Sequence, residues 1–497
     1  MNIKQAKEQI RNTLRAYLSR DALGNYRIPA VRQRPVLLIG PPGIGKTQIM
    51  EQIAAEENVG LVSYTITHHT RQSAIGLPFI EKRVYDGEEH TVTEYTMSEI
   101  LGSVYALTEK TGIREGILFL DEINCVSETL APMMLQFLQC KTFGNQRLPE
   151  GWLIVAAGNP PEYNRSVRDF DVVTLDRVKR IQVEEDFPVW KEYALRKGLH
   201  GAVISYLDLR KENFYRIENS ADGMQFATAR GWEDLSEILC AYEALGIAPD
   251  TELAVQYIQM PAVARDFTAY YALYNRYRQV YHIDDILHGS VPKVTVTEFS
   301  AAPFDEKLAV MGLLLSRLAE ASRDTRRQDA LCSALFDALS GVKERLPEKP
   351  SESLQEIIAA RRLTLRRAQD AGQDDREQKL LRQAELKRLE DFLKALDGET
   401  ASEAQMDTLR ALFAGDTAKR EALADETGSM FDNAFRFLEQ AVGQSQELIL
   451  FVTEITAGYD TAWYVGEFGC DAYFRHNREL LFDETRQSIL DRLRDKP

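Results

Sequence analysis

The stretch GPPGIGKT, Gly40 to Thr47, decides the fold that this sequence predicts. It follows the apolar run Val36–Ile39 and precedes the helix-compatible run Gln48–Glu57, which is the strand–loop–helix order of a phosphate-binding loop. Its glycines allow the backbone to curl so that N–H groups point at phosphate oxygens. We expect Lys46 to reach the β- and γ-phosphates of a nucleoside triphosphate, and the Thr47 hydroxyl to ligate Mg²⁺. The loop residues expected to bind nucleotide are Gly40, Pro41, Pro42, Gly43, Ile44, Gly45, Lys46 and Thr47.

The composition is that of an ordinary soluble protein. The chain has 497 residues, enough for about three domains, with 44% hydrophobic and 27% charged residues. Its formal net charge of −16 argues against a broad, nonspecific nucleic-acid surface, although a local basic stripe is compatible with it. No apolar run approaches the roughly 18 residues of a membrane helix, and the N-terminus lacks the apolar core of a signal peptide. The five cysteines are widely spaced and indicate reduced thiols, so we expect a cytoplasmic protein.

Residues 34–185 alternate short apolar runs with helical patterns, which predicts an α/β fold with a five-stranded parallel sheet. The expected strands are Val36–Ile39, Leu61–Ile66, Ile117–Leu120, Leu153–Ala157 and Arg180–Val183. From Pro188 onward helical patterns dominate, so we expect an all-α lid and an all-α C-terminal extension. The expected organisation is an N-terminal helix at 1–24, an α/β nucleotide-binding domain at 25–186, a helical lid at 187–290, a helical segment at 303–345, a charged helical hairpin at 351–397 and a C-terminal helical region at 402–497.

Three segments of the second half have distinct patterns. Val291–Ala302 alternates like a strand at a boundary, and Leu346–Ser353 has the prolines and serines of a linker. Gln355–Leu396 is charge-rich with a turn signal at Asp370–Asp375, which predicts a helical hairpin. Its leucine stripe comprises Leu380, Leu386, Leu389, Leu393 and Leu396. The hairpin is either a solvated pair packed on its own domain or a partner-binding coiled-coil arm.

A second element that carries chemistry is ILFLDEIN, Ile117 to Asn124. An apolar strand ends there in two adjacent carboxylates, which side-chain alternation sends in different directions. We expect Asp121 to hold the Mg²⁺ shell and Glu122 to orient, or accept a proton from, the attacking water. Aspartate followed by glutamate favours hydrolysis of ATP over transfer to a small acceptor.

Polar and basic residues follow the later strands. Asn159 ends the run LIVAAGNP and is expected to hydrogen-bond the attacking water or the γ-phosphate. A guanidinium that stabilises γ-phosphate charge can come from a neighbouring subunit. Arg177 in TLDRVKR is the first choice for it, Arg180 the second and Arg168 the third. Arg230 in TARGW opens a helix of the expected lid, from which it could report nucleotide state.

Together these motifs resemble a known family. The ordered set GPPGIGKT, ILFLDEIN, AAGNPPEYN, LDRVKR and TARGW resembles the AAA+ ATPases. The phrases SAIGLPFI, RLPEGWLIVAAGNP and FPVWKEYA are similar to their MoxR-type, dynein-related (AAA_5-like) branch. The resemblance covers roughly residues 25–285 and implies a P-loop AAA+ core, with ATP bound at the subunit interfaces of a ring, usually of six subunits. It also implies a chaperone-like activity on a protein client, often with a partner that carries a von Willebrand factor A domain.

The resemblance assigns roles to particular residues. Lys46 and Thr47 correspond to Walker A, Asp121 and Glu122 to Walker B, and Asn159 to sensor 1. Arg177 corresponds to the arginine finger that acts in trans. Arg230 corresponds to sensor 2, although Ala229 stands where the family often has proline.

Two further expectations concern the surroundings of the site. Glu81–Ser98 falls between the second and third strands, where this branch carries an insertion that faces the ring's pore. It is either a substrate-contacting element or an exposed β-hairpin without a function. Tyr26 and Ile28 precede the first strand, where they either bury an adenine base or form an apolar staple.

The sequence therefore predicts a Mg²⁺-dependent AAA+ ATPase that forms a homo-oligomeric ring and remodels a protein partner. Two alternatives remain open. One is a nucleotide-dependent binding module that hydrolyses ATP too slowly for mechanical work. The other is a DNA-acting AAA+ motor, against which the acidic composition weighs.

Overall fold

The computed structural model describes residues 1–68, 74, 76–85, 87–143, 146–163, 170, 172–220, 223–345, 349–371, 376–397 and 401–478. These residues form two compact units. The first contains Met1–Asp186 and Ala359–Gln383, and the second contains Phe187–Ile358 and the described residues from Ala384 onward. Among the described residues, no helix is both long and apolar enough to cross a bilayer.

The first unit is built on the parallel sheet that the sequence predicts. Its five strands are β1 (Val36–Ile39), β2 (Gly60–Thr65), β5 (Gly116–Asp121), β8 (Trp152–Gly158) and β9 (Lys179–Gln182). They are arranged in the order β2-β5-β8-β1-β9, and all four pairings are parallel. The predicted strands and the α/β class are thus confirmed, with boundaries shifted by at most one residue at either end.

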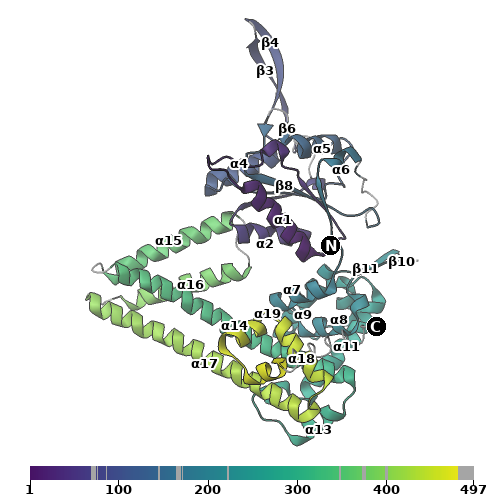
Figure 1. Cartoon of the computed structure of the whole chain (residues 1–497), viewed down its shortest axis with the longest axis vertical. Coiled ribbons are helices and arrows are strands. Elements are labelled where there is room, and N and C mark those ends of the chain that lie inside the picture. Colours follow the sequence, from purple (N-terminus) through teal and green to yellow (C-terminus); the bar gives the residue numbers. More distant parts are fainter. Residues whose placement is uncertain are drawn as a thin grey trace, which may run out of the picture. The chain divides into compact units, whose positions relative to one another are not determined.

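Helices cover both faces of this sheet (Figure 1). Because strand side chains alternate, Val36 and Leu38 pack into one core and Leu37 and Ile39 into the other. The first core includes residues of α1 (Ile3–Leu18) and α2 (Lys46–Glu57). The second includes residues of α4 (Glu99–Thr111) and α5 (Ala131–Cys140), and the short helix α6 (Val172–Asp176) precedes β9. Strands buried on both faces explain why the sequence shows continuous apolar runs rather than alternation.

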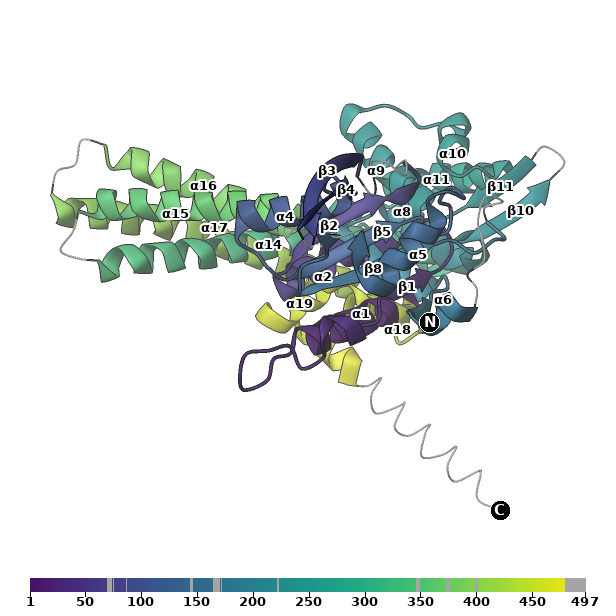
Figure 2. The same cartoon turned by 90° about the horizontal axis from the view of Figure 1, so that it is seen from above.

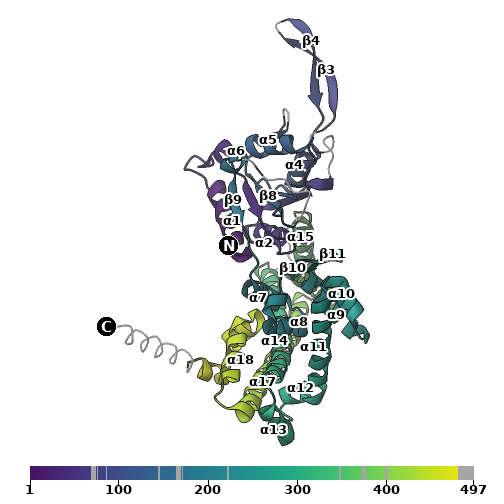
Figure 3. The same ribbon diagram turned by 90° about the vertical axis from the view of Figure 1, so that its right-hand side faces the viewer.

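A long β-hairpin interrupts the connection between β2 and α4. Strands β3 (Pro78–Tyr85) and β4 (Glu88–Tyr95) pair antiparallel over their whole length and project from the sheet (Figure 3). All of β3 and most of β4 are exposed. The segment Glu81–Ser98 therefore lies largely in an exposed β-hairpin, which begins and ends three residues earlier than that segment. A much smaller hairpin, β6 (Thr142–Phe143) and β7 (Gln146–Arg147), precedes β8.

The second unit is mostly helical and has one continuous hydrophobic core, from Phe187 in the expected lid to Tyr473 near the end of the described chain. Its elements before residue 303 are α7 (Phe187–Lys197), α8 (Gly201–Leu209), β10 (Arg216–Ser220), β11 (Gly223–Ala227), α9 (Ala229–Leu245), α10 (Thr251–Tyr257), α11 (Pro261–Val280), α12 (Ile283–Leu287) and α13 (Lys293–Ala301). The two-stranded hairpin β10–β11 is an addition to the all-α lid that the sequence predicts.

The strand-like alternation at Val291–Ala302 is wrong as a prediction, since these residues form helix α13. Thr295 and Phe299, four residues apart, are the buried positions, and Val294 is 64% exposed. Phe299 packs against Phe437 at 5.0 Å between ring centroids. Burial of one helical face therefore overrides the β propensity of the valines and threonines.

After residue 303 the described part of the chain is mainly helical. Its helices are α14 (Phe304–Glu344), α15 (Pro350–Asp370), α16 (Arg376–Ala395), α17 (Ser402–Val442), α18 (Gln446–Ala457) and α19 (Tyr459–Phe468). Helices α14 and α17 lie side by side (Figure 2), with a hydrogen bond of 3.0 Å between the Thr325 and Thr427 hydroxyls.

Two details of the charged region differ from the sequence-based expectation. The predicted linker Leu346–Ser353 is too long, because α15 begins at Pro350; proline is tolerated in the first turn of a helix. Leu380 does not share the burial of the predicted stripe, since it is 49% exposed, whereas Leu386, Leu389 and Leu396 are buried.

Candidate functional site

The loop Gly40–Thr47 lies where β1 ends and α2 begins, at the edge of the sheet formed by the strands' carboxyl ends. Gly43 and Gly45 have φ angles of 75° and 89°, the left-handed region that glycine adopts without strain. Gly40 approaches the backbone so closely that a Cβ there would lie 2.9 Å from the Val183 carbonyl oxygen. The loop therefore requires glycine at these three positions.

The ammonium group of Lys46 is held inside this loop. The residue is 8% exposed, and Nζ donates to the carbonyl oxygens of Gly40 and Pro41 at 2.8 and 2.7 Å. It also donates to Oδ1 of Asn159 at 2.8 Å. Three oxygens thus satisfy three ammonium protons, which stabilises a buried positive charge. The lysine expected to reach phosphate and the asparagine expected at the γ-phosphate are in direct contact.

Thr47 and Asp121 form the second contact of the site. The Thr47 hydroxyl donates to Oδ2 of Asp121 at 3.3 Å, which joins the start of α2 to the end of β5. A hydroxyl and a carboxylate are hard oxygen ligands, and a Mg²⁺ site commonly uses one or two such groups together with water and phosphate oxygens. These two residues fit a Mg²⁺ site of that kind.

Glu122 adopts an unusual backbone conformation. Its φ of 56° is left-handed, which costs a non-glycine residue on the order of 1 kcal/mol. Its N–H donates to Oδ1 of Asp121 at 2.9 Å, and the next N–H, of Ile123, donates to the Ala157 carbonyl at 2.9 Å. These bonds hold the turn in place and send the two carboxylates in different directions.

The carboxylate of Glu122 accepts a hydrogen bond from a residue that sequence reasoning missed. Oγ1 of Thr67 donates to Oε2 of Glu122 at 2.6 Å. Thr67 lies two residues beyond β2, and Thr65 at the end of β2 pairs with Asp121. The only sequence signal for Thr67 was its position just after a predicted strand.

Asn124 was also missed. Its side-chain Nδ2 donates to the backbone carbonyl of Asn159 at 2.7 Å, and the residue is 5% exposed. Next to it, burial together with the charges of Glu122 and Asp121 raises the pKa of the Cys125 thiol. A raised pKa keeps that thiol protonated near neutral pH, so Cys125 is not poised as a nucleophile.

The first two candidate arginines, Arg177 and Arg180, lie away from this cluster. Arg177, just after α6, is exposed, and its Nη1 donates to Oε1 of Gln139 on α5. Arg180 is exposed on the edge strand β9. Because Lys179 pairs with Val36, the first residue of β1, Arg177 lies at the edge where the strands begin. The four residues of β1 span roughly 13 Å between that edge and the loop that holds Lys46.

The other two candidate arginines are not in the described part of the first unit. Arg230 is exposed in the first turn of α9 in the second unit, where the Thr228 side chain caps the helix by accepting from the Gly231 N–H at 3.2 Å. Arg168 lies outside the described residues.

Tyr26 lies at the edge of the sheet opposite the phosphate loop, which does not support its expected contact with an adenine base. Its hydroxyl donates to Oε1 of Glu115 at 2.8 Å, and a Cβ on Gly151 would come within 2.6 Å of that hydroxyl. Glu115 and Gly151 directly precede β5 and β8, so Tyr26 is at the edge opposite the phosphate loop. Burial and the Glu115 carboxylate raise the pKa of Tyr26 to about 12. Ile28, two residues further along the chain, is half-buried, and its backbone carbonyl accepts a hydrogen bond from the Gln33 side chain.

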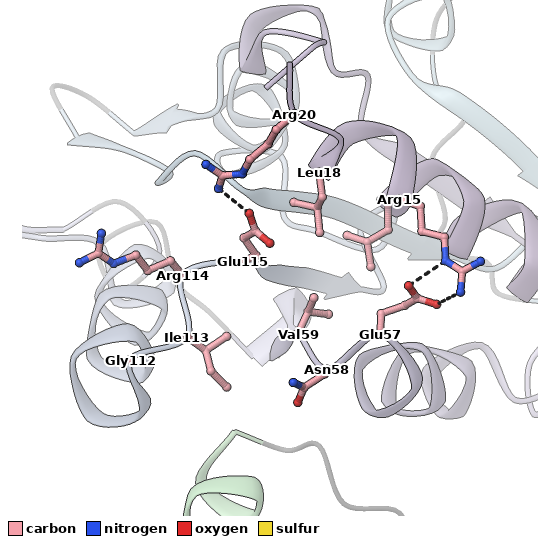
Figure 4. A pocket seen from close by; sticks show the side chains of 11 residues that line it. Arg15, Leu18, Arg20, Glu57, Asn58, Val59, Gly112, Ile113, Arg114 and Glu115 are labelled. Carbon is pink, nitrogen blue, oxygen red and sulfur yellow. Dashed lines mark hydrogen bonds and ion pairs between the residues drawn. The ribbon is translucent and has the colours of Figure 1, made fainter. Parts of the chain in front are cut away.

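A cavity of about 430 Å³ lies at this same opposite edge of the sheet (Figure 4). Val59 and Glu115, which precede β2 and β5, line it together with residues of α1. Its guanidinium groups from Arg15 and Arg20 are ion-paired with Glu57 and Glu115 at 2.8 and 2.7 Å. The cavity is therefore separate from the loop–carboxylate cluster at the other edge.

One family model and two solved structures are similar to parts of this chain. Residues 35–178 match the family model of the AAA domain (dynein-related subfamily). Among solved structures, a mutant of RuvB from Thermotoga maritima is similar at 15% identity and a TM-score of 0.28, covering 60% of this chain and 75% of that one. NtrX from Brucella abortus, in complex with ADP, is similar at 14% identity and a TM-score of 0.26, covering 54% of this chain and 69% of that one. No curated protein matches the sequence.

The matched segment contains β1, β2, β5 and β8 and the whole cluster from Lys46 to Asn159. The fold class is therefore the P-loop AAA+ fold, with a five-stranded parallel sheet followed by a mostly helical region.

Proposed function

We propose that this chain is a Mg²⁺-dependent ATPase of the MoxR-type AAA+ class that works as a ring and remodels a protein partner. The observation that supports it most is the cluster at the carboxyl edge of the sheet, in which Lys46 bonds Asn159 and Thr47 bonds Asp121. Glu122 follows directly in the chain. Phosphate binding, metal binding and water activation thus have neighbouring side chains, at the edge where open α/β sheets bind ligands.

Each residue has a part in the proposed reaction. The carbonyls of Gly40 and Pro41 hold the Lys46 ammonium in position and away from water before nucleotide binds. Phosphate oxygens would then replace these carbonyls as its partners. Thr47 and Asp121 would hold Mg²⁺, which neutralises phosphate charge. Asn159 hydrogen-bonds the attacking water or the γ-phosphate. Glu122 turns from Thr67 to the water and accepts its proton.

The assembly and the partner extend this proposal. The position of Arg177, exposed and at the opposite edge from Lys46 of the same chain, favours a role at a neighbouring subunit's nucleotide. The resemblance to MoxR-type proteins supports a ring of six subunits and a partner with a von Willebrand factor A domain. Arg230, in the second unit, would report nucleotide state as sensor 2. The exposed hairpin β3–β4 would contact the client.

Steady-state phosphate release with Mg²⁺ and ATP tests the proposed reaction. We expect the natural chain to turn over ATP, and Glu122→Gln to bind ATP but release phosphate about 10²- to 10⁴-fold more slowly, because the general base is lost. Glu109→Gln is the matched control, since Glu109 is an exposed glutamate on α4 of the same unit. Its turnover should equal that of the natural chain.

Three results would count against the proposal. Tight ATP binding without measurable turnover by the natural chain would favour the slow binding module instead. Rapid hydrolysis by Glu122→Gln would show that Glu122 is not the base. A turnover that rises with added duplex DNA and falls steeply with salt would favour a DNA-acting motor.

A further inference from the structure

The turn after β5 brings the side chain of Asn124 into contact with the end of β8. Glu122 is left-handed, and the bond from Ile123 N–H to the Ala157 carbonyl ties the turn to β8. Ile123 is 2% exposed, which anchors the turn in the core between the sheet and α4 and α5. As a result, Asn124 points at Gly158 and Asn159 rather than at solvent.

The fit between Asn124 and Gly158 is close. A Cβ added to Gly158 would lie 2.4 Å from Oδ1 of Asn124, and the nearest other atoms also belong to Asn124. Its Nδ2 donates to the Asn159 carbonyl at 2.7 Å. If the Asn124 amide were flipped, its Oδ1 would face the Asn159 carbonyl oxygen at about the same distance, and two acceptors would meet. The orientation in which Nδ2 donates is therefore the favourable one. The Asn124 side chain can therefore occupy this position only because residue 158 is glycine.

The same asparagine pair connects three parts of the site. Asn124 holds the backbone of Asn159, and the side chain of Asn159 accepts from Lys46 Nζ at 2.8 Å. Asn124 itself has no hydrogen bond to the loop Gly40–Thr47 among those found in the described residues. It can act on the chemistry only through Asn159.

We infer that Asn124 is a positioning residue that fixes Asn159 relative to Glu122 and Lys46, with Gly158 as the space it requires. The inference rests on the proposed hydrolytic function. Without the bond from Asn124, the end of β8 shifts and the Asn159 amide no longer meets the attacking water. Nucleotide binding persists because Lys46, Thr47 and the loop are unchanged. Misplacement of such a group by about 1 Å lowers turnover up to 10²-fold.

Asn124→Ala and Asn124→Asp test this directly. We expect Asn124→Ala to lower kcat between about 10- and 100-fold while the Kd of a fluorescent ATP analogue with Mg²⁺ changes by less than about twofold. In Asn124→Asp the new side chain has the shape of asparagine but places a carboxylate oxygen against the Asn159 carbonyl oxygen. Its kcat at neutral pH should therefore be lower than that of Asn124→Ala. When the carboxyl group is protonated it can donate again. The ratio of its kcat to that of the natural chain should therefore rise as pH falls, whereas the ratio for Asn124→Ala stays flat.

Gly158→Ala gives an independent measurement. Its methyl group should displace the Asn124 side chain and lower kcat as Asn124→Ala does. Added to Asn124→Ala, the same substitution should cost little, because the atoms it meets have been removed. Additive losses in the double variant, or an ATP affinity that falls in parallel with kcat, would overturn the positioning role.

The outcomes separate this inference from the function on which it rests. A natural chain without ATP turnover removes the proposed function and this inference with it. An active natural chain with an equally active, folded Asn124→Ala removes only the role of Asn124. A pH-independent Asn124→Asp ratio would likewise show that donation to Asn159 is not what Asn124 contributes.

Discussion

The contact between Thr67 and Glu122 bears on the proposed reaction, because it holds the side chain expected to act as the base. The Thr67 hydroxyl donates to the Glu122 carboxylate at 2.6 Å, so one acceptor position of the expected base is occupied. The second oxygen, Oε1, can still accept a proton from water, but the bond to Thr67 limits the orientations that the carboxylate can take. Thr67 therefore restrains Glu122 in the arrangement described here.

Thr67→Val should release that restraint. A hydrogen bond at such an exposed position is worth about 0.5–1.5 kcal/mol, so we expect basal ATP turnover to rise by about twofold to tenfold. Valine keeps the shape of threonine, and Thr67→Ser, which keeps the hydroxyl, is the control expected to match the natural chain. If Thr67→Val is instead slowed as strongly as Glu122→Gln, Thr67 orients the base rather than restraining it.

The residues that sequence reasoning found share one property. Lys46, Asp121 and Asn159 each follow the end of an apolar run, and parallel strands end at the same edge, so their meeting is predictable. The contacts of Thr67 and Asn124 depend on β2 lying next to β5 and on the left-handed φ of Glu122. No local pattern encodes either feature, which is why both residues were missed.

Among the structural elements, the buried strands were the most predictable. Strands such as β5 and β8 are buried along almost their whole length, which leaves continuous apolar runs in the sequence. Helix α13 was mistaken for a strand because its short stretch of valine and threonine fits either period, and only its packing on Phe437 selects the helix. For β3–β4 the sequence indicated an exposed insertion, but not where its two strands begin and end.

The hairpin β3–β4 exposes apolar side chains that are not part of the hydrophobic cores found among the described residues. Ile80 and Val84 lie on one face at 75% and 68% exposure. A two-stranded hairpin that packs on nothing is only marginally stable in water, which favours a bound partner. The apolar face and the unpaired strand edges suit an extended, unfolded polypeptide.

The double substitution Ile80→Lys with Val84→Lys tests that role. We expect basal ATP turnover to stay unchanged, because neither side chain touches the nucleotide cluster, and any stimulation of turnover by unfolded casein to be lost. The matched control is Leu23→Lys, which adds charge at an 86% exposed leucine of the same unit. Casein stimulation that survives the double substitution, or disappears in the control, would contradict a client contact at this face.

For the whole molecule, the proposed role of Arg177 would link the chemistry to assembly. An arginine that stabilises γ-phosphate charge contributes about 10³- to 10⁵-fold to phosphoryl transfer. Within its own chain Arg177 lies at the wrong edge of the sheet for this purpose. We therefore expect Arg177→Ala to bind ATP normally while losing about 10³-fold or more of its turnover, and dilution of the natural chain to monomers to have a similar effect. Arg180→Ala is the comparison, since Arg180 is the next candidate on β9.

Mixing two inactive variants distinguishes action in trans from action within one chain. Lys46→Ala should lose nucleotide binding but keeps Arg177, whereas Arg177→Ala keeps the nucleotide cluster. In a mixed ring, some intact clusters of Arg177→Ala chains face an Arg177 from a Lys46→Ala neighbour, so turnover should reappear on mixing. If Arg177 acted on its own chain, no combination of these subunits would contain a complete site, and the mixture would stay inactive. If Arg177→Ala alone retained full turnover in the assembled state, Arg180 or another arginine would have to supply the charge.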